Sequence, residues 1–287
     1  MAAILGVGVA TLDIINTTSE FPQEDSKLRA LSQRVARGGN VCNSLTVLSQ
    51  LGNQCVWSGT LADDNAAALI LTDLSKNKIN CINCHSLSDK SSPTSYITIN
   101  RRNGSRTIVH YRDLPELQLD QFTKIDFSHI DCCHFEGRNI EQTILMVAYL
   151  RSHHPKIIIS IEIEKPRDLI EQLYADAELL FFSREYVQHS GQNSVEKFLQ
   201  NKKLVIARKK TILICTWGDK GAWLTTPNND IFHQAAIPTN PLVDTLGAGD
   251  TFIAGFLHQW LIDKDAKKAL TFATILAAKK CGQTGFE

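Results

Sequence analysis

The stretch PLVDTLGAGDTFIAGF, residues 241–256, combines residue types that suit the binding and transfer of an anionic group. Gly247 and Gly249 can adopt backbone angles that side chains forbid, and the apolar run from Thr251 onward predicts a helix. Loop amides and the positive end of the helix dipole would then converge on one point, which favours a phosphate. Asp250 stands at that point and could accept the proton of an attacking alcohol during phosphoryl transfer. The alternative is that Asp250 only caps the helix, a frequent use of aspartate.

The two commonest nucleotide signatures are absent from the sequence. GAGDTF has no lysine after its glycines, as a P-loop requires, and Phe252 stands where G-x-G-x-x-G needs its third glycine. Gly6-Val-Gly8 near the start of the chain fails in the same way, with Thr11 in third place. The phosphate site is therefore expected to be of another kind.

The elements that must position this turn follow an alternating pattern. Short β-branched and aromatic runs predict strands that are covered on both faces, at 4–10, 156–163, 178–183 and 211–217. Segments with apolar residues at three-to-four spacing predict helices between and after them, at 41–52, 139–152, 195–203 and 265–282. The pattern predicts an α/β chain with a mainly parallel sheet.

One region breaks this rhythm. TSYITIN (94–100) and SRTIVHY (105–111) alternate in polarity and flank Arg101-Arg102-Asn103-Gly104, whose Asn-Gly pair is a strong turn signal. We expect a hairpin here that serves as a lid or as an edge extension of the core. No repeat, low-complexity tract or linker interrupts residues 1–287, which predicts one folding unit.

Composition and charge exclude several classes of partner. The chain has 287 residues, 43% of them apolar, which is enough for a full core. Lys+Arg and Asp+Glu both total 30, so no basic surface for nucleic acid or membrane lipid is expected. The first residues contain Asp13 after a short apolar run and lack a basic leader, which predicts a cytoplasmic protein without a membrane span.

The eight cysteines are expected to be reduced, and most of them to be small buried apolar residues. Cys81-Ile-Asn-Cys84-His85 matches the C-x-x-C-H pattern of haem attachment. That attachment requires export, for which the sequence shows no signal, so we interpret the match as chance.

Seven ordered segments resemble one known family. DTLGAGDTF (244–252) resembles the C-terminal signature of the ribokinase-like (PfkB) family of sugar and nucleoside kinases, and Gly38-Gly39-Asn40 with Asn43 resembles its N-terminal signature. Five further segments resemble the ketohexokinase branch of that family: 21–40, 103–111, 134–139, 161–167 and 279–286. The resemblance spans nearly the whole chain. It implies a ribokinase-like three-layer α/β/α core with a mainly parallel sheet, in a single domain, and a small β lid formed by about 14–36 and 94–111.

The resemblance also implies roles on the sugar side. Asp250 would be the general base, and an anion hole would form from the amides of Gly247, Ala248 and Gly249. Sugar binding would fall to Asp13, Gly39, Asn40 and Asn43. Asp13 follows the first predicted strand, at the sheet edge where α/β proteins bind ligands. The two asparagines stand three apart at the start of a predicted helix, so both amides can face one ligand; otherwise Asn40 is an N-cap and Asn43 is solvated.

On the nucleotide side, the resemblance implies that Arg106 meets the phosphates of ATP, unless it is a solvated hairpin charge. The loop after the fourth predicted strand would bind ATP, through Thr216, Trp217, Gly218, Asp219 and Gly221; the alternative is an ordinary β-turn. Cys281 would close the adenine pocket, and core packing suits it better than a role as a reactive thiol.

The magnesium ligands are not assigned. Many relatives carry N-x-x-E where this chain has Ser183-Arg-Glu-Tyr186, a departure that fits the ketohexokinase branch. Mg²⁺ is still expected as a cofactor with ATP, because it binds largely through phosphates and waters. Two further polar groups have open alternatives. The charged run 162–167 is either part of the site or a solvated cluster, and His134 with Glu136 could belong to a zinc site but lacks a third ligand.

These expectations describe an ATP-dependent kinase that transfers the γ-phosphoryl group to the 1-hydroxyl of a ketohexose, most closely D-fructose. The lid of relatives implies a homodimer and a closure step that excludes water. The alternatives are a kinase for another sugar, a phosphosugar or a nucleoside, a binding protein of this fold without catalysis, and a purely structural oligomer.

Overall fold

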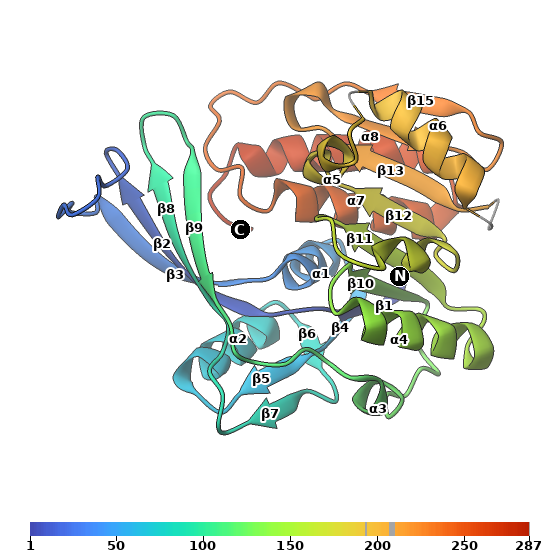
Figure 1. Cartoon of the computed structure of the whole chain (residues 1–287), viewed down its shortest axis with the longest axis horizontal. Helices are drawn as coiled ribbons and strands as arrows, with labels where there is room; N and C mark the ends of the chain where they lie inside the picture. Colours follow the sequence, from blue (N-terminus) through green and yellow to red (C-terminus); the bar gives the residue numbers. More distant parts are fainter. Residues whose placement is uncertain (193, 207–209, 287) are drawn as a thin grey trace.

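A computed structural model of the chain describes residues 1–192, 194–206 and 210–286. Its centre is a nine-stranded sheet with the order β15-β14-β13-β12-β11-β10-β1-β4-β6 (Figure 1). Neighbours from β6 to β13 are parallel, and β14 and β15 are added antiparallel at one edge. In chain order the strands are β1 (Ala3–Val7), β4 (Gln54–Ser58), β6 (Ile79–Cys81), β10 (Cys132–Glu136), β11 (Ile158–Ile163), β12 (Leu179–Phe182), β13 (Ile212–Thr216), β14 (Ala222–Thr225) and β15 (Ile231–Gln234).

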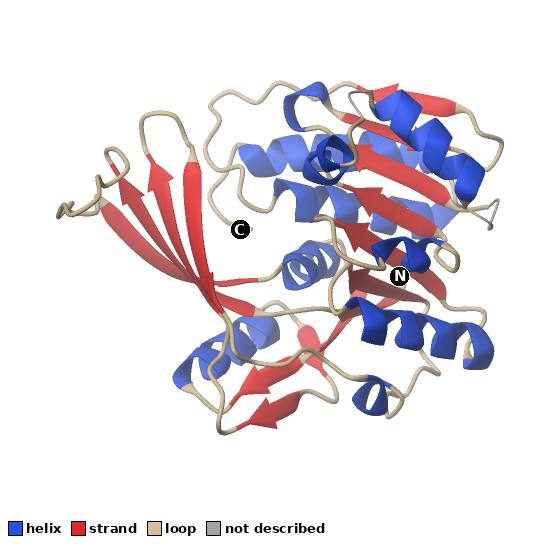
Figure 2. Ribbon diagram, viewed as in Figure 1, coloured by secondary structure: helices blue, strands red, loops and turns tan. Residues whose placement is uncertain are grey.

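Helices cover both faces of this sheet (Figure 2). One face carries α1 (Asn40–Gln50), α2 (Asn65–Lys76), α7 (Ala248–Asp263) and α8 (Ala266–Cys281). The other carries α3 (Leu119–Phe122), α4 (Ile140–His153), α5 (Arg184–His189), α6 (Val195–Val205) and the 3₁₀ helix η1 (Ile170–Tyr174). The buried apolar side chains form two clusters, one on each face of the sheet. The chain is therefore a three-layer α/β/α structure, as predicted.

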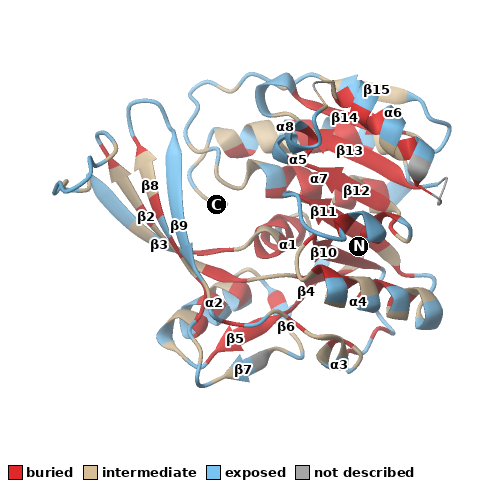
Figure 3. Cartoon of the chain, in the orientation of Figure 1, coloured by how far each residue is buried: buried red, intermediate tan, exposed pale blue. Residues whose placement is uncertain are grey.

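The predicted parallel strands are confirmed as β1, β11, β12 and β13, and the predicted helices as α1, α4, α6 and α8. Strands such as β12, with all four residues buried, are apolar throughout because helices pack on both sides of them (Figure 3). A segment that faces water on one side would alternate instead.

A separate four-stranded sheet stands beside the core, with the order β3-β2-β8-β9 (Figure 1). Its strands are β2 (Thr11–Thr18), β3 (Ser32–Gly38), β8 (Thr94–Asn100) and β9 (Arg106–Tyr111). The predicted hairpin is confirmed: β8 and β9 are antiparallel, and Gly104 in their turn has φ 69°. All of β9 is exposed (Figure 3). A third, two-stranded parallel sheet pairs β5 (Thr60–Ala62) with β7 (His85–Leu87).

The cysteines depart from the expectation at one point. Five are buried free thiols, as predicted: Cys42, Cys55, Cys132, Cys133 and Cys215. Cys81 and Cys84, however, form a disulfide, so the expectation that all are reduced is wrong for this pair. The turn after β6 brings their Cα atoms to 6.3 Å, within the usual range for a bridge.

None of the helices in the described part of the chain combines the length and the apolar composition that crossing a membrane demands.

Candidate active site

A cavity of about 470 Å³ lies between the small sheet and the carboxyl ends of the parallel strands. This edge is where open α/β sheets bind their ligands, because loops and helix N-termini gather there. Nine of the residues that we predicted from the sequence line it: Asp13, Gly39, Asn40, Asn43, Arg106, Thr216, Gly247, Gly249 and Asp250. The structure thus brings together segments from five distant parts of the chain.

The predicted anion turn opens helix α7. The helix begins at Ala248, three residues earlier than predicted, and Gly247 is its N-cap in the left-handed conformation with φ 80°. A Cβ on Gly249 would meet open space, so a ligand can approach its backbone closely. The amide of Ala248 donates to the Thr245 carbonyl oxygen at 3.3 Å within the turn. The first-turn amides of Gly249 and Asp250 have no helical partner by geometry and suit an incoming anion.

Asp250 lies in the first turn of α7 and does not cap it. Its side chain makes no cap hydrogen bond, and the residue is only 7% exposed. Asn43 of α1 donates from Nδ2 to Asp250 Oδ2 at 2.7 Å, and Ser44 Oγ donates to the Asp250 backbone oxygen at 3.1 Å. Burial raises the pKa of Asp250 to about 7, and Glu164 and Glu136 add to that rise. A carboxyl that titrates near neutral pH is suited to act as a general base.

Two further buried carboxylates stand beside Asp250. Glu162, at the end of β11, accepts from Asn40 Nδ2 at 3.3 and 3.2 Å, one bond to each oxygen. Glu136, at the end of β10, accepts from the amides of Val9 at 3.3 Å and Val41 at 3.1 Å. Burial raises the pKa of both carboxyls. Glu162 therefore holds the Asn40 side chain at the cavity. Asn40 is the first residue of α1 and not its N-cap, which is Gly39.

These glutamates were underestimated from the sequence. Glu162 belongs to the run 162–167, for which a solvated cluster was the alternative to a site, and of the charged residues in that run Glu164, Lys165 and Arg167 are exposed while Glu162 is buried. Glu136 was weighed with His134 as a zinc pair. The His134 Nδ1 instead contacts Ser160 Oγ at 2.9 Å, and burial lowers its pKa to about 4, so the ring is neutral. Within the described part of the chain, no group of three His, Cys, Asp or Glu side chains could hold a metal by itself.

Asp13 faces the cavity from a different element than expected. We predicted it at the end of the first parallel strand, but it lies on β2 of the small sheet, because the chain leaves the core after Val7 and starts a new strand at Thr11. Its Oδ1 accepts from Thr11 Oγ1 at 2.8 Å, and burial raises its pKa. A Cβ on Gly38 would lie 2.2 Å from Asp13 Oδ2, so glycine is required there.

The predicted nucleotide residues are brought together only in part. Arg106 and Thr216 line the cavity. The rest of the predicted nucleotide loop, after Thr216, forms a tight turn that does not line the cavity. Gly218 and Gly221 in this turn have φ 58° and 90°. The Trp217 amide donates to the Gly221 oxygen at 2.8 Å across this turn, and Asp219 is exposed on it.

Cys281 lies at the end of α8 and is half-buried. Its backbone oxygen accepts from the amides of Val243 at 2.8 Å and Asp244 at 3.2 Å, which ties the anion loop to α8. Burial raises the pKa of its thiol, so it is a poor nucleophile, consistent with a packing role.

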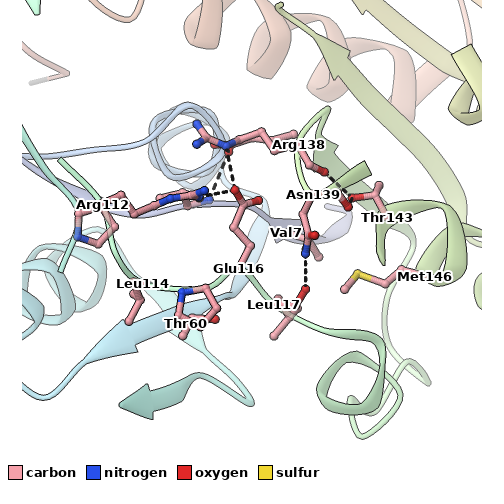
Figure 4. A pocket seen from close by; sticks show the side chains of 15 residues that line it. Val7, Thr60, Arg112, Leu114, Glu116, Leu117, Arg138, Asn139, Thr143 and Met146 are labelled. Atoms are coloured by element: carbon pink, nitrogen blue, oxygen red, sulfur yellow. Dashed lines mark hydrogen bonds and ion pairs between the residues drawn. The ribbon is translucent and has the colours of Figure 1, made fainter. Parts of the chain in front are cut away.

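A much smaller cavity of about 30 Å³ adjoins the first one (Figure 4). Arg112 and Arg138 converge there on Glu116, the latter at 3.3 Å, and Arg138 also lies 3.8 Å from Glu136 Oε2. Both cavities are lined by Glu136 and Arg138. The ion pairs hold Arg138 in place at the edge of the larger cavity.

Comparison with known proteins decides the family. The model of the pfkB family of carbohydrate kinases matches residues 1–287. The chain belongs to this family. It is 36% identical to ketohexokinase from Mus musculus over 291 residues, covering 99% of this chain and 97% of that protein.

Solved structures agree on the fold of this pfkB family member. A ribokinase described as putative, from Agrobacterium tumefaciens, superposes with a TM-score of 0.85 at 21% identity and covers 99% of this chain and 92% of its own. Arabidopsis thaliana ribokinase complexed with ribose and ATP gives 0.80 at 18%, covering 99% and 94%. The three-layer core with its small sheet is therefore the ribokinase fold, and the family is one of carbohydrate kinases.

Proposed function

We propose that this pfkB kinase phosphorylates the 1-hydroxyl of a ketohexose, D-fructose in the first place, with the γ-phosphoryl group of ATP. The observation that carries the proposal is the position of Asp250: a buried carboxyl with a pKa near 7, at the mouth of an anion-binding turn, in a cavity lined by amides and carboxylates. Such a lining suits a polyhydroxylated sugar. The 36% identity to mouse ketohexokinase supports the choice of sugar.

In this proposal the side chains of one cavity divide the work of phosphoryl transfer. Asp13, Asn40 and Asn43 bind sugar hydroxyls, together with the backbone at Gly39. Asp250 takes the proton of the attacking hydroxyl, and the turn formed by Gly247, Ala248 and Gly249 stabilises the charge of the moving phosphoryl group. Asp250 needs no large change in pKa to do this at neutral pH, because burial has already raised it.

The nucleotide would approach from the side of β13 and the hairpin. Arg106 lies in the lining and offers a guanidinium to the phosphates. We assign the turn with Thr216, Trp217, Gly218, Asp219 and Gly221 to the nucleotide as well, and Cys281 to the wall beside the adenine. Lys165 and Arg167 line the same cavity and are exposed in it, so they are further candidates for phosphate contact.

Magnesium fits the residues present. The Glu164 side chain is exposed in the cavity, on the loop that follows β11. Mg²⁺ takes oxygen ligands and keeps several waters, so one such carboxylate beside the phosphates is sufficient. We propose that Glu164 holds the ion, which would neutralise charge on the transferred group.

The small sheet would act as the lid of this site and as a dimer interface. Its inner face, with Asp13, Ser95 and His110, lines the cavity. Its outer face presents apolar side chains in register across the strands, exposed by 52–65%: Val35, Tyr96, Val109 and Tyr111. Apolar patches of this kind mark contact surfaces. We propose that two copies pair through this face, and sedimentation of a Val109→Glu variant as a monomer would support it.

The test of the proposed function is the conversion of D-fructose by Mg·ATP, with the product identified by phosphorus NMR. Formation of fructose 1-phosphate above the sugar-free background is the expected result. Turnover of ribose or another sugar, without turnover of fructose, would indicate a kinase of different specificity. Binding of ATP and sugar without turnover would indicate a protein that kept the fold and lost catalysis.

The Asp250→Asn variant separates these last two cases. In a kinase it abolishes turnover while the protein still binds its ligands, as ligand-induced thermal shifts report. In a pure binding protein it leaves the affinity for the ligands nearly unchanged. Absence of any thermal shift with ATP and sugar would point to a structural oligomer.

The cytoplasmic location and the absence of nucleic-acid or membrane partners, expected from charge and composition, stay predictions. Localisation of the tagged full chain in cells checks the first of them.

A further inference from the structure

Arg37 is a buried arginine beside the glycines of the N-terminal signature. It lies near the end of β3, and its side chain is only 3% exposed. Its guanidinium is enclosed between α1 and α2, where a buried charge is costly unless every donor is satisfied. Its contacts therefore define what it does.

The three nitrogens of the guanidinium donate to four different groups. Nε donates to Asp73 Oδ1 of α2 at 2.6 Å, and Nη2 donates to Thr46 Oγ1 of α1 at 2.7 Å. Nη1 donates to Asn43 Oδ1 at 3.0 Å, and to the Gly38 oxygen at 3.5 Å. The carboxylate of Asp73 compensates its charge. Because the fork is planar and rigid, these partners set its orientation.

The contact with Asn43 has a consequence for the base. Arginine offers only donors, so the atom of the Asn43 amide that faces Arg37 must be the oxygen. The amide nitrogen then faces Asp250, and Nδ2 donates to Oδ2 at 2.7 Å. With the amide reversed, its oxygen would face a carboxylate oxygen and its nitrogen would face the guanidinium.

We propose that Arg37 is a positioning residue for phosphoryl transfer: through Asn43, it holds the Asp250 carboxylate in one orientation. The inference rests on the proposed role of Asp250 as base. Arg37 is not among the residues that line the cavity, and it acts on Asp250 through the Asn43 amide and through its positive charge.

The charges around Asp250 show why such a residue is needed. Burial and the carboxylates of Glu164 and Glu136 raise the pKa of Asp250. The negative charge of Asp250 in turn raises the pKa of Glu162. Against them stand the hydrogen bond from Asn43 and the positive charge of Arg37, both of which lower that pKa. Other charged groups line the same cavity farther along it: Asp13, Arg106, His110, Arg138, Lys165 and Arg167. Without the charge of Arg37 and the hydrogen bond from an oriented Asn43, burial and the neighbouring carboxylates would raise the pKa of Asp250 further.

The experiment is the pH profile of kcat/KM for Arg37→Gln in the full chain, with Mg·ATP and the sugar that the wild type phosphorylates. We expect the acidic limb to move upward by about one pH unit, since a hydrogen bond to a charged group is worth that much. Activity at pH 6.5 then falls about tenfold, and the loss shrinks toward pH 9, where Asp250 is ionised in both proteins. An unmoved limb, or an equal loss at every pH, overturns the inference.

A matched control distinguishes this role from a structural one. Asp73→Asn removes the charge partner of Arg37 and leaves the Asn43–Asp250 contact in place, so it should lower the thermal midpoint without moving the acidic limb. If Arg37→Gln fails to fold, Arg37→Lys retains a charge near Asp73 but cannot reach three acceptors, and it should move the limb in the same direction. A limb that moves equally in the Asp73 variant overturns the inference.

A second readout is independent of turnover. The difference in unfolding free energy between a protein and its Asp250→Asn counterpart grows with pH and levels off at the folded-state pKa of Asp250, so the pH at which it levels off reports that pKa. We expect this pH to be higher by about one unit for the Arg37→Gln pair than for the wild-type pair. If fructose is not a substrate but this pH is higher for the Arg37→Gln pair, the choice of sugar fails and the positioning role stands. If this pH is the same for both pairs, the positioning role itself is overturned.

Discussion

Replacing Asp250 by asparagine should make this protein more stable while it abolishes transfer. Asp250 is 7% exposed, and its carboxylate shares the cavity edge with Glu136 and Glu162. Ionising this carboxyl in the folded protein costs free energy, because it is buried away from water. Ionising it in the unfolded chain carries no such cost. The variant has nearly the same shape and no charge, so it can still accept the hydrogen bond from Asn43 through its side-chain oxygen.

The magnitude follows from the pKa of the base. Burial raises it from 3.8 to about 7, and a tenfold change in proton affinity corresponds to about 1.4 kcal/mol, so the ionised form costs about 4 kcal/mol. An acidic group whose pKa is higher in the folded than in the unfolded state makes its full stabilising contribution at a pH below its unfolded-state pKa. That contribution is lost as the pH rises through its folded-state pKa. The advantage of Asp250→Asn is therefore small near pH 4, grows between pH 4 and 7, and is constant above. Loss of the Asp250 charge also removes a repulsive neighbour of the Glu162 carboxylate, which stabilises the folded variant in the same direction.

Urea denaturation at pH 5 and at pH 9 measures the effect, with Asp168→Asn as a control for the loss of an exposed carboxylate. We expect the Asp250→Asn variant to exceed the wild type by several kcal/mol more at pH 9 than at pH 5. A difference that is the same at both pH values, or a variant that is less stable at pH 9, would refute the reasoning that burial raises this pKa.

Further predictions concern the same turn. For the wild type, kcat/KM should fall about tenfold per pH unit below pH 7, because the base is protonated there; a flat profile down to pH 5 would contradict this. Gly247→Ala should lower both the thermal midpoint and kcat, since a Cβ would lie 2.2 Å from the Phe286 ring and φ is 80°, a conformation that costs about 1–2 kcal/mol for alanine. Gly249→Ala should lower kcat and leave the midpoint nearly unchanged, because its Cβ points into open space; equal midpoint losses in the two variants would argue against the steric explanation.

Much of the fold could be predicted because its signals are local. The runs at 178–183 and 211–217 are apolar over lengths typical of strands, and they became β12 and β13. The Asn-Gly pair at 103–104 predicted the turn between β8 and β9. The helix after the anion turn was placed three residues late because its start is set by Gly247 in a left-handed conformation, and no side-chain cap marks it.

The parts of the site that were missed depend on contacts between distant segments. Glu162 ends a buried strand, a position that favours a site, yet its neighbours in the sequence are charged and also suit a solvated cluster, and Glu136 was paired with His134 as an incomplete zinc site. The partners of the two carboxylates come from distant segments: the amides of Val9 and Val41 donate to Glu136, and the side chain of Asn40 donates to Glu162. Asp13 was placed on the wrong element, because the sequence does not show where the chain leaves one sheet for another.

The sequence by itself determined the alternation of strands and helices and the glycine turn before Asp250, because hydrophobic period and glycine conformation are properties of neighbouring residues. The tertiary structure decided the state of the base. Asn43 and Asp250 are 207 positions apart and meet at 2.7 Å, and Arg37 orients the amide between them. The pKa of a carboxyl depends on its burial and on the charges within a few ångströms, and those are set only when the chain has folded.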